Sequence, residues 1–282
     1  MISRRKFISN IAIGGIAISA LPNAVFAFTG DNKLNRIGYI AGMIKNELQE
    51  GDWKTILKKT ADLGYTEYEG GILGDSPKEF LNYCKSIGQK PIAGGITFSK
   101  DMDEVQISMD KLNEAGMEYA ISYWPWLVGG PFKLDDCKIS VDILNQIGEL
   151  AKKNGLKFCW HNHDKEFLEM EEGKPFDYLM KHTEKELVSC EMDIYWVKKG
   201  GADPVKVLRE YEGRIPILHV KDMADDADKS IICPGKGNID FPSIFAEANK
   251  QGIKHYFVER DNIVDGLGCL KSSMEYLEAL RF

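Results

Sequence analysis

The sequence predicts a single (β/α)8 barrel, because short apolar segments alternate eight times with segments of helical periodicity. Two further observations support this fold class. The chain has no glycine-rich GxGxxG turn after its first strand-like segment, which disfavours an open dinucleotide-binding sheet. It also has no linker or low-complexity stretch, so residues 28–282 are expected to form one α/β domain, a TIM barrel.

The predicted strands are short and apolar, as expected for parallel strands covered by helices. They occupy residues 36–40, 67–70, 90–94, 119–123, 157–161, 187–193, 215–220 and 255–259. The predicted helices occupy residues 53–63, 77–87, 102–115, 139–154, 175–182, 204–211, 242–251 and 270–280. Pro77 and Pro204 open two of these helices, since proline lacks an N–H that would be unpaired in the first turn. Gly64 and Gly155 follow two others, where the left-handed conformation ends a helix.

Residues 1–27 precede the predicted barrel and have the pattern of a twin-arginine-type signal peptide. Arg4 and Arg5 lie before a short apolar run, 11–18, and small residues lead to a cleavage site after Ala27. The run is too short and too interrupted by glycine to span a bilayer comfortably. We therefore expect a periplasmic or otherwise exported protein without stable membrane insertion after export, and an uncleaved anchor is the alternative.

The net charge argues against one class of partner. The chain has a formal net charge of −7, and removal of the signal segment takes away Arg4, Arg5 and Lys6 but no acidic residue, which gives −10. Phosphate backbones would repel so acidic a chain, so nucleic acid is not an expected partner. The sequence leaves the oligomeric state open, and a homo-oligomer is one option.

The six cysteines form no CxxC pair. An exported location would permit disulfides, but the spacing of the cysteines predicts none. Cys159 and Cys190 lie inside apolar strand-like runs, where buried free thiols are expected.

Polar side chains recur where the predicted strands end, which is the end of a barrel that carries the chemistry. They are Glu69, His161, His163, Asp193, His219, Lys221 and Glu259. Each one alone could be structural: Asp193 could cap a turn, and Glu259 could form an ion pair. Together, however, the imidazole and carboxylate groups suit one divalent metal ion: Mn, Zn, Co or Mg.

Four runs of residues near these strand ends resemble the xylose-isomerase-like barrel superfamily. They are residues 160–167 (WHNHDKEF), 192–196 (MDIYW), 218–222 (LHVKD) and 257–261 (FVERD), and residues 234–241 (PGKGNIDF) match a further family segment. Within the superfamily, the chain is most similar to exported proteins of the sugar phosphate isomerase/epimerase type. The resemblance implies a barrel enzyme that acts on a sugar or similar polyol.

The resemblance also implies a metal site made by Glu, Asp, His and Glu from strands five to eight. Asp193, His219 and Glu259 match the last three positions, whereas the first position holds the run His161-Asn162-His163. We assign His161 as the ligand, with His163 as the competing choice. Because the family's epimerases are thought to use two ligand carboxylates as opposed bases, a histidine here puts symmetric proton exchange in doubt.

The expected chemistry is abstraction of a proton beside a carbonyl, with Glu259 as the base. His163, Glu166 and Lys221 are the candidates for the partner acid. Lys221 has a structural alternative, an ion pair with Asp222 or Glu191. Glu69, Trp126 and Trp196 are the residues expected to contact the substrate.

Three functions are compatible with these residues. The first is a metal-dependent isomerase or epimerase of a sugar or polyol. The second is a metal-dependent lyase or dehydratase that acts on a keto-sugar or 3-keto-glycoside, which the histidine and the expected export favour. The third is a carbohydrate-binding barrel without catalytic activity.

Overall fold

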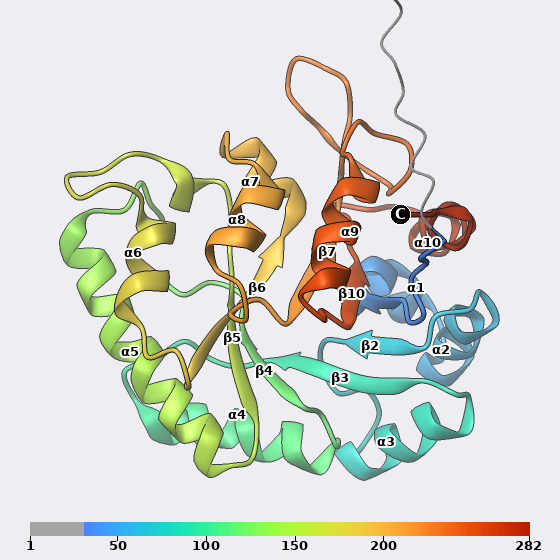
Figure 1. Cartoon of the computed structure of the whole chain (residues 1–282). Coiled ribbons are helices and arrows are strands. Elements are labelled where there is room, and N and C mark those ends of the chain that lie inside the picture. Colours follow the sequence, from blue (N-terminus) through green and yellow to red (C-terminus); the bar gives the residue numbers. More distant parts are fainter. Residues whose placement is uncertain (1–30) are drawn as a thin grey trace, which may run out of the picture.

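The structure, a computed structural model, describes residues 31–282, so the predicted signal segment lies outside the described residues. Eight parallel strands close into a barrel in the order β1-β10-β7-β6-β5-β4-β3-β2, which confirms the predicted fold class (Figure 1). Their bounds are β1 Gly38–Ile40, β2 Glu67–Glu69, β3 Lys90–Gly95, β4 Tyr119–Ser122, β5 Lys157–His161, β6 Val188–Asp193, β7 Ile217–Val220 and β10 His255–Val258.

Helices surround the barrel and cover the outer face of the strands (Figure 1). Their bounds are α1 Lys45–Glu50, α2 Trp53–Asp62, α3 Pro77–Ser86, α4 Met102–Glu114, α5 Leu134–Lys153, α6 Pro175–His182, α7 Ile194–Lys199, α8 Pro204–Glu210, α9 Phe241–Lys250 and α10 Gly266–Ala279. Within residues 31–282, no helix has both the length and the apolar character needed to cross a bilayer.

Four helices differ from the sequence-based prediction. Helix α1 was not predicted, and α10 begins at Gly266 rather than at residue 270. Helix α5 begins at Leu134, before the expected start at residue 139, because the side chain of Asp136 accepts a hydrogen bond from the backbone N–H of Lys133. The short helix α7 was also not predicted. It begins directly after β6, where one carboxylate oxygen of Asp193 accepts a hydrogen bond from the N–H of Trp196 (2.8 Å).

An antiparallel hairpin, β8 (Asp222–Met223) and β9 (Ile231–Ile232), follows β7 and was also not predicted. The buried carboxylate of Asp222 holds the connecting loop by accepting backbone hydrogen bonds from Met223, Gly235, Gly237 and Ile239 at 2.8 to 3.2 Å. A Cβ atom on Gly237 would collide with the Met223 carbonyl and the Asp222 carboxylate. The PGKGNIDF motif therefore wraps a buried carboxylate.

The prediction that the chain has no disulfide is wrong. Cys233, after β9, is bonded to Cys269 in α10, with 5.7 Å between their Cα atoms. The two cysteines are 36 residues apart in sequence, and only the closure of the barrel brings the hairpin loop beside the last helix. Among the described residues, the other four cysteines are free and buried, which confirms the prediction for Cys159 and Cys190.

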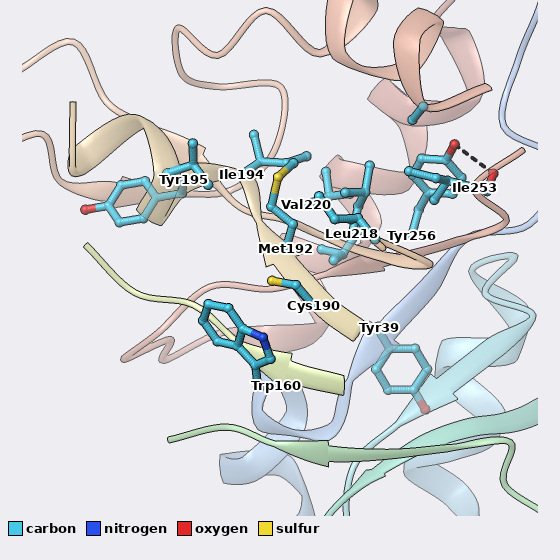
Figure 2. Close-up of a cluster of buried hydrophobic side chains, with 14 of the residues drawn as sticks. Tyr39, Trp160, Cys190, Met192, Ile194, Tyr195, Leu218, Val220, Ile253 and Tyr256 are labelled. Atoms are coloured by element: carbon cyan, nitrogen blue, oxygen red, sulfur yellow. Dashed lines mark hydrogen bonds between the residues drawn. The ribbon is translucent and has the colours of Figure 1, made fainter. Parts of the chain in front are cut away.

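The strand residues alternate between the barrel interior and the layer of helices. Figure 2 shows Trp160, Cys190, Met192, Leu218 and Val220 in the hydrophobic cluster outside β5, β6 and β7. Since neighbouring residues on a strand face opposite sides, the residues between them face the barrel axis. A separate apolar cluster fills the middle of the barrel: Ile92, Ala93, Tyr119, Ile121, Cys159, Ile217 and Phe257.

Candidate metal centre

The alternation brings the four predicted metal ligands together at the C-terminal end of the barrel. One ligand atom from each of His161, Asp193, His219 and Glu259 lies within 4.8 Å of the other three. They come from β5, β6, β7 and the residue after β10, which are consecutive in the barrel. His161, Asp193 and His219 are buried, and Glu259 is partly buried.

The imidazole of His219 lies at the centre of this cluster. Its Nδ1 is 2.6 Å from Oε2 of Glu259, on the side of the predicted ligands. Its Nε2 lies on the other side, 3.0 Å from Oε1 of Glu69 and 3.3 Å from Oε2 of Glu191. Carboxylates therefore contact both ring nitrogens of His219.

The imidazole of His161 is held in a similar way. Its Nδ1 is 3.1 Å from Oε2 of Glu191, and its Nε2 is 3.8 Å from Oδ2 of Asp193. Glu191 therefore contacts both histidines of the cluster. It pairs with His161 in the β5–β6 register, and it lies one layer deeper than Asp193 on the same strand.

Lys221 places a buried ammonium group beside the cluster. Its Nζ lies 3.1 Å from Oδ2 of Asp193, 3.2 Å from Oε2 of Glu259 and 2.9 Å from Oδ2 of Asp261. The alternative of an ion pair with Asp222 or Glu191 is not what the structure has. Asp222 instead holds the hairpin loop, and Glu191 contacts the histidines.

Asp193 has two roles, one for each oxygen. Oδ1 caps helix α7 through the N–H of Trp196, and Oδ2 faces His161 and Lys221. The amide of Asn162 fixes the backbone here, because its oxygen accepts from the N–H of Asp193 (2.9 Å). Asp193 can therefore cap helix α7 with one oxygen and serve as a metal ligand with the other.

Burial and the neighbouring charges set the protonation of these groups. Burial raises the pKa of Asp193 to about 6, although Lys221 opposes this shift. Burial also favours the neutral form of Glu259, but Lys221 and His219 hold its pKa well below the usual range. Burial and the nearby His219 lower the pKa of His161, so this imidazole is neutral at pH 7 and keeps one lone pair.

His163 lies beside the cluster between two indole rings. Its ring centre is 5.1 Å from that of Trp124 and 5.5 Å from that of Trp196. Burial, followed by the charge of Lys221, lowers the pKa of His163 to about 4. Its buried Nδ1 has no hydrogen-bond partner among the described residues. The ammonium of Lys221 also lies over the indole of Trp196, with 5.1 Å between Nζ and the ring centre.

Trp126 and Glu166 lie behind the site and contact each other. The indole N–H of Trp126 donates to Glu166 (2.8 Å), and the ring stacks on Phe132 with 3.7 Å between centres. The second oxygen of Glu166 accepts from the backbone N–H of His163 (3.0 Å). The structure thus places both residues in the support of the β5 loop rather than with the four predicted ligands.

The structure adds three residues that were not selected as site residues from the sequence. Tyr123 donates a hydrogen bond to Glu69 (2.9 Å), Trp124 flanks His163, and Glu191 contacts both histidines. Tyr123 and Trp124 directly follow β4, and Glu191 lies on β6. These positions near strand ends are the only signal in the sequence that could have indicated the three residues. Strand parity puts residues 191 and 193 on the same face, so Glu191 could have been found beside Asp193.

The cluster fits a divalent metal ion. Two imidazoles and two carboxylates form a donor set suited to zinc, manganese or cobalt. Two ligands that are each about 2.1 Å from one ion lie no more than about 4.2 Å apart. Because all four ligand atoms lie within 4.8 Å of one another, binding of an ion would require a contraction of at most about 0.6 Å. Oδ2 of Asp193 is buried and makes no hydrogen bond within residues 31–282, and its neighbour there is the ammonium of Lys221 at 3.1 Å.

Comparison with known families agrees with the architecture. Residues 97–280 match the family described as the xylose isomerase-like TIM barrel. The chain belongs to this family.

Individual relatives differ in name. The chain is 33% identical over 128 residues to inosose dehydratase of Clostridium tetani (strain Massachusetts / E88), a match that covers 39% of this chain and 42% of the relative. A sugar phosphate isomerase/epimerase from Parabacteroides distasonis ATCC 8503 is 25% identical, with a TM-score of 0.74 over 87% of this chain and 98% of that chain. The IOLI protein, solved with a binding zinc atom, has the same fold, with 17% identity and a TM-score of 0.70 over 88% of this chain and 99% of that chain.

Proposed function

We propose that this chain is a divalent-metal-dependent dehydratase that acts on a ketone of a sugar or cyclic polyol. The observation that carries the proposal is the imidazole of His161 on β5, opposite the carboxylate of Glu259 in the ligand set. Exchange of a proton between two ligand carboxylates would need a second carboxylate at the β5 position. Elimination needs one base and one proton donor, and Glu259 and Lys221 provide this pair. The similarity to inosose dehydratase supports the same reading.

Glu259 is the proposed base. Lys221 and His219 keep its pKa low, so the carboxylate is ionised and able to accept a proton at neutral pH. A divalent ion bound at the centre would supply polarisation of the substrate carbonyl. Glu259 takes the proton from the carbon beside the carbonyl, and the electron pair released by this C–H bond forms a C=C bond as the neighbouring C–O bond breaks.

Lys221 is the proposed proton donor to the departing hydroxyl. Its ammonium is 3.2 Å from Oε2 of Glu259, so base and acid lie next to each other. Although burial disfavours the charge, the carboxylates of Asp193, Glu259 and Asp261 raise the pKa of Lys221 and keep it protonated. The hydroxyl leaves as water, and the reaction requires no oxidant or reductant.

Trp196 and His163 are the proposed contacts for the substrate ring. The C–H face of a polyol packs well on an indole, and Trp196 lies beside both Lys221 and His163. The free Nδ1 of neutral His163 offers a hydrogen bond to a substrate hydroxyl. Trp126 and Glu166 lie behind His163 and support it: Trp126 donates a hydrogen bond to Glu166, which accepts one from the backbone N–H of His163.

The test is incubation of the metal-loaded protein with an inosose, a free ketose and a 3-keto-glucoside in heavy water. We expect loss of water from one of these ketones, and we expect Glu259→Gln to reduce the rate at least about 100-fold. Lys221→Met should still exchange the proton beside the carbonyl with solvent but should lose the elimination. Glu67→Gln, a change at the opposite end of the barrel, is the control and should keep full activity.

An isomerase or epimerase is the second candidate, supported by the similarity to the Parabacteroides distasonis protein. Deuterium in a stereoisomer of the substrate, without loss of water, would favour this candidate over the dehydratase. Tight binding without exchange or elimination would instead indicate a carbohydrate-binding barrel without activity.

A further inference from the structure

We infer that Glu191 is a positioning residue that makes His161 competent to bind metal by fixing its tautomer. This inference rests on the proposed metal site and goes beyond it, because it assigns a role to a residue that lies outside the ligand set. Oε2 of Glu191 lies 3.1 Å from Nδ1 of His161, inside a fully buried part of the barrel.

The contact determines which nitrogen of His161 carries hydrogen. An imidazole that binds a metal ion is neutral, so only one of its two nitrogens carries a hydrogen. Oε2 of Glu191 accepts that hydrogen from Nδ1, which leaves the lone pair on Nε2, the nitrogen that faces Asp193. A ring that carried its hydrogen on Nε2 would have no lone pair on the side of the other ligands.

Glu191 serves His161 more specifically than it serves His219. Nε2 of His219 has two carboxylate neighbours, Glu69 at 3.0 Å and Glu191 at 3.3 Å, whereas Nδ1 of His161 has Glu191 alone among the described residues. Loss of Glu191 would therefore leave His219 with an acceptor and His161 without one. A carboxylate behind a metal-binding imidazole also makes the ring more basic and holds its orientation.

The position of Glu191 explains how a strand can carry both groups. Glu191 and Asp193 are two residues apart on β6, so both face the barrel axis, with Glu191 one layer deeper. Its second oxygen, Oε1, makes no hydrogen bond within the described part of the chain. Glu191 therefore contacts Nδ1 of His161 from deeper in the barrel. Asp193 faces Nε2 of the same ring with Oδ2, its proposed ligand oxygen.

The barrel contains a matched control. Glu67 is also a buried glutamate on a strand, and its Oε2 lies 2.9 Å from Nδ1 of His255. This pair lies at the start of β2 and β10, at the N-terminal end of the barrel and away from the metal ligands. Glu191→Met and Glu67→Met therefore remove the same kind of contact, one beside the site and one remote from it.

The experiment measures Zn²⁺ affinity of the metal-free protein by competition with a chromophoric chelator, for wild type, Glu191→Met, Glu191→Gln and Glu67→Met. We expect Glu191→Met to weaken the affinity about 10- to 100-fold. Glu191→Gln keeps an acceptor and should lie between Glu191→Met and wild type, and Glu67→Met should match wild type. In the His161→Ala background, Glu191→Met should cause no further loss.

Long-range ¹H–¹⁵N spectra of the metal-free protein supply the second readout. His161 should carry its hydrogen on Nδ1 in wild type and in Glu67→Met, and on Nε2 in Glu191→Met. Unchanged Zn²⁺ affinity and tautomer in Glu191→Met would overturn the inference while leaving the metal site intact. A wild type that binds no Zn²⁺ would overturn the metal site as well. If Glu191→Met does not fold, Glu191→Ala, which also lacks an acceptor, decides, and an affinity within about twofold of wild type overturns the inference.

Discussion

Glu166 illustrates how the interior of the protein controls a single ionisable group. The carboxyl group is fully buried and accepts hydrogen bonds from Trp126 and from the backbone of His163. Burial raises the pKa of Glu166 from 4.5 to about 7, against the opposing effect of these hydrogen bonds. Glu166 is therefore part neutral acid and part carboxylate near neutral pH, although it does not contact the four predicted ligands.

This shift predicts how stability depends on pH. Below pH 4.5 the group is protonated in both the folded and the unfolded chain and has no effect. Between pH 4.5 and about 7 the unfolded chain releases the proton more readily, so the free energy of unfolding falls as the pH rises, by about 3 kcal/mol in total. We expect Glu166→Gln to flatten this decline, measured by urea unfolding at pH 4.5, 5.5, 6.5 and 7.5. The same slope in both proteins would contradict the assignment.

At the scale of the elements, most strands and helices could be predicted from the sequence because their periodicity and their proline and glycine boundaries are local signals. Helix α7 could not, because Asp193 both ends β6 and caps the helix, so that no loop separates the two elements. The β8–β9 hairpin also escaped prediction, since its strands have two residues each and depend on a buried carboxylate.

The same difference between local and distant signals applies to the site. Strand parity and strand ends indicated the four predicted ligands, which the structure brings together. The contact between Glu191 and His161 depends on how deeply two neighbouring strands place their side chains, and sequence spacing does not record depth. The position of Trp126 behind the site, stacked on Phe132, depends in the same way on the path of a loop.

The hairpin gives the prediction at this scale. Asp222→Ala should lower the free energy of unfolding by about 2 to 4 kcal/mol, because four backbone N–H groups lose a charged acceptor. Asp240→Ala, which removes the exposed cap of α9, is the control and should cost about 1 kcal/mol. Guanidinium unfolding measures both changes, and proteolysis of Asp222→Ala should start within residues 224–238. Equal losses in the two variants would show that the loop does not depend on Asp222.

At the scale of the whole molecule, two connections near the site join segments that are distant in the sequence. Strand β1 pairs with β10, and the disulfide joins the hairpin loop after β7 to the last helix. Both connections involve β10 or the segment that follows β7. These segments contain or adjoin His219, Lys221 and Glu259. The disulfide therefore stabilises the segment that follows β7, next to the proposed metal centre.

Loss of the disulfide should have a measurable cost. A cross-link that closes 36 residues restricts the unfolded chain by about 4 kcal/mol in the entropy model. We expect Cys233→Ser/Cys269→Ser to lose stability of this order, and wild type treated with reductant to behave like the double variant. Titration of the denatured, non-reduced protein should find four thiols. A finding of six thiols would show that the bond does not form.

The central claim is that His161, Asp193, His219 and Glu259 hold one divalent metal ion. The most direct test is the metal content of purified wild type, His161→Ala and His163→Ala, measured by inductively coupled plasma mass spectrometry after equal metal loading and desalting. We predict about one ion per chain in wild type and in His163→Ala, and loss of the ion in His161→Ala. Equal retention in all three proteins would contradict the assignment of His161, and no ion in wild type would contradict the metal centre itself.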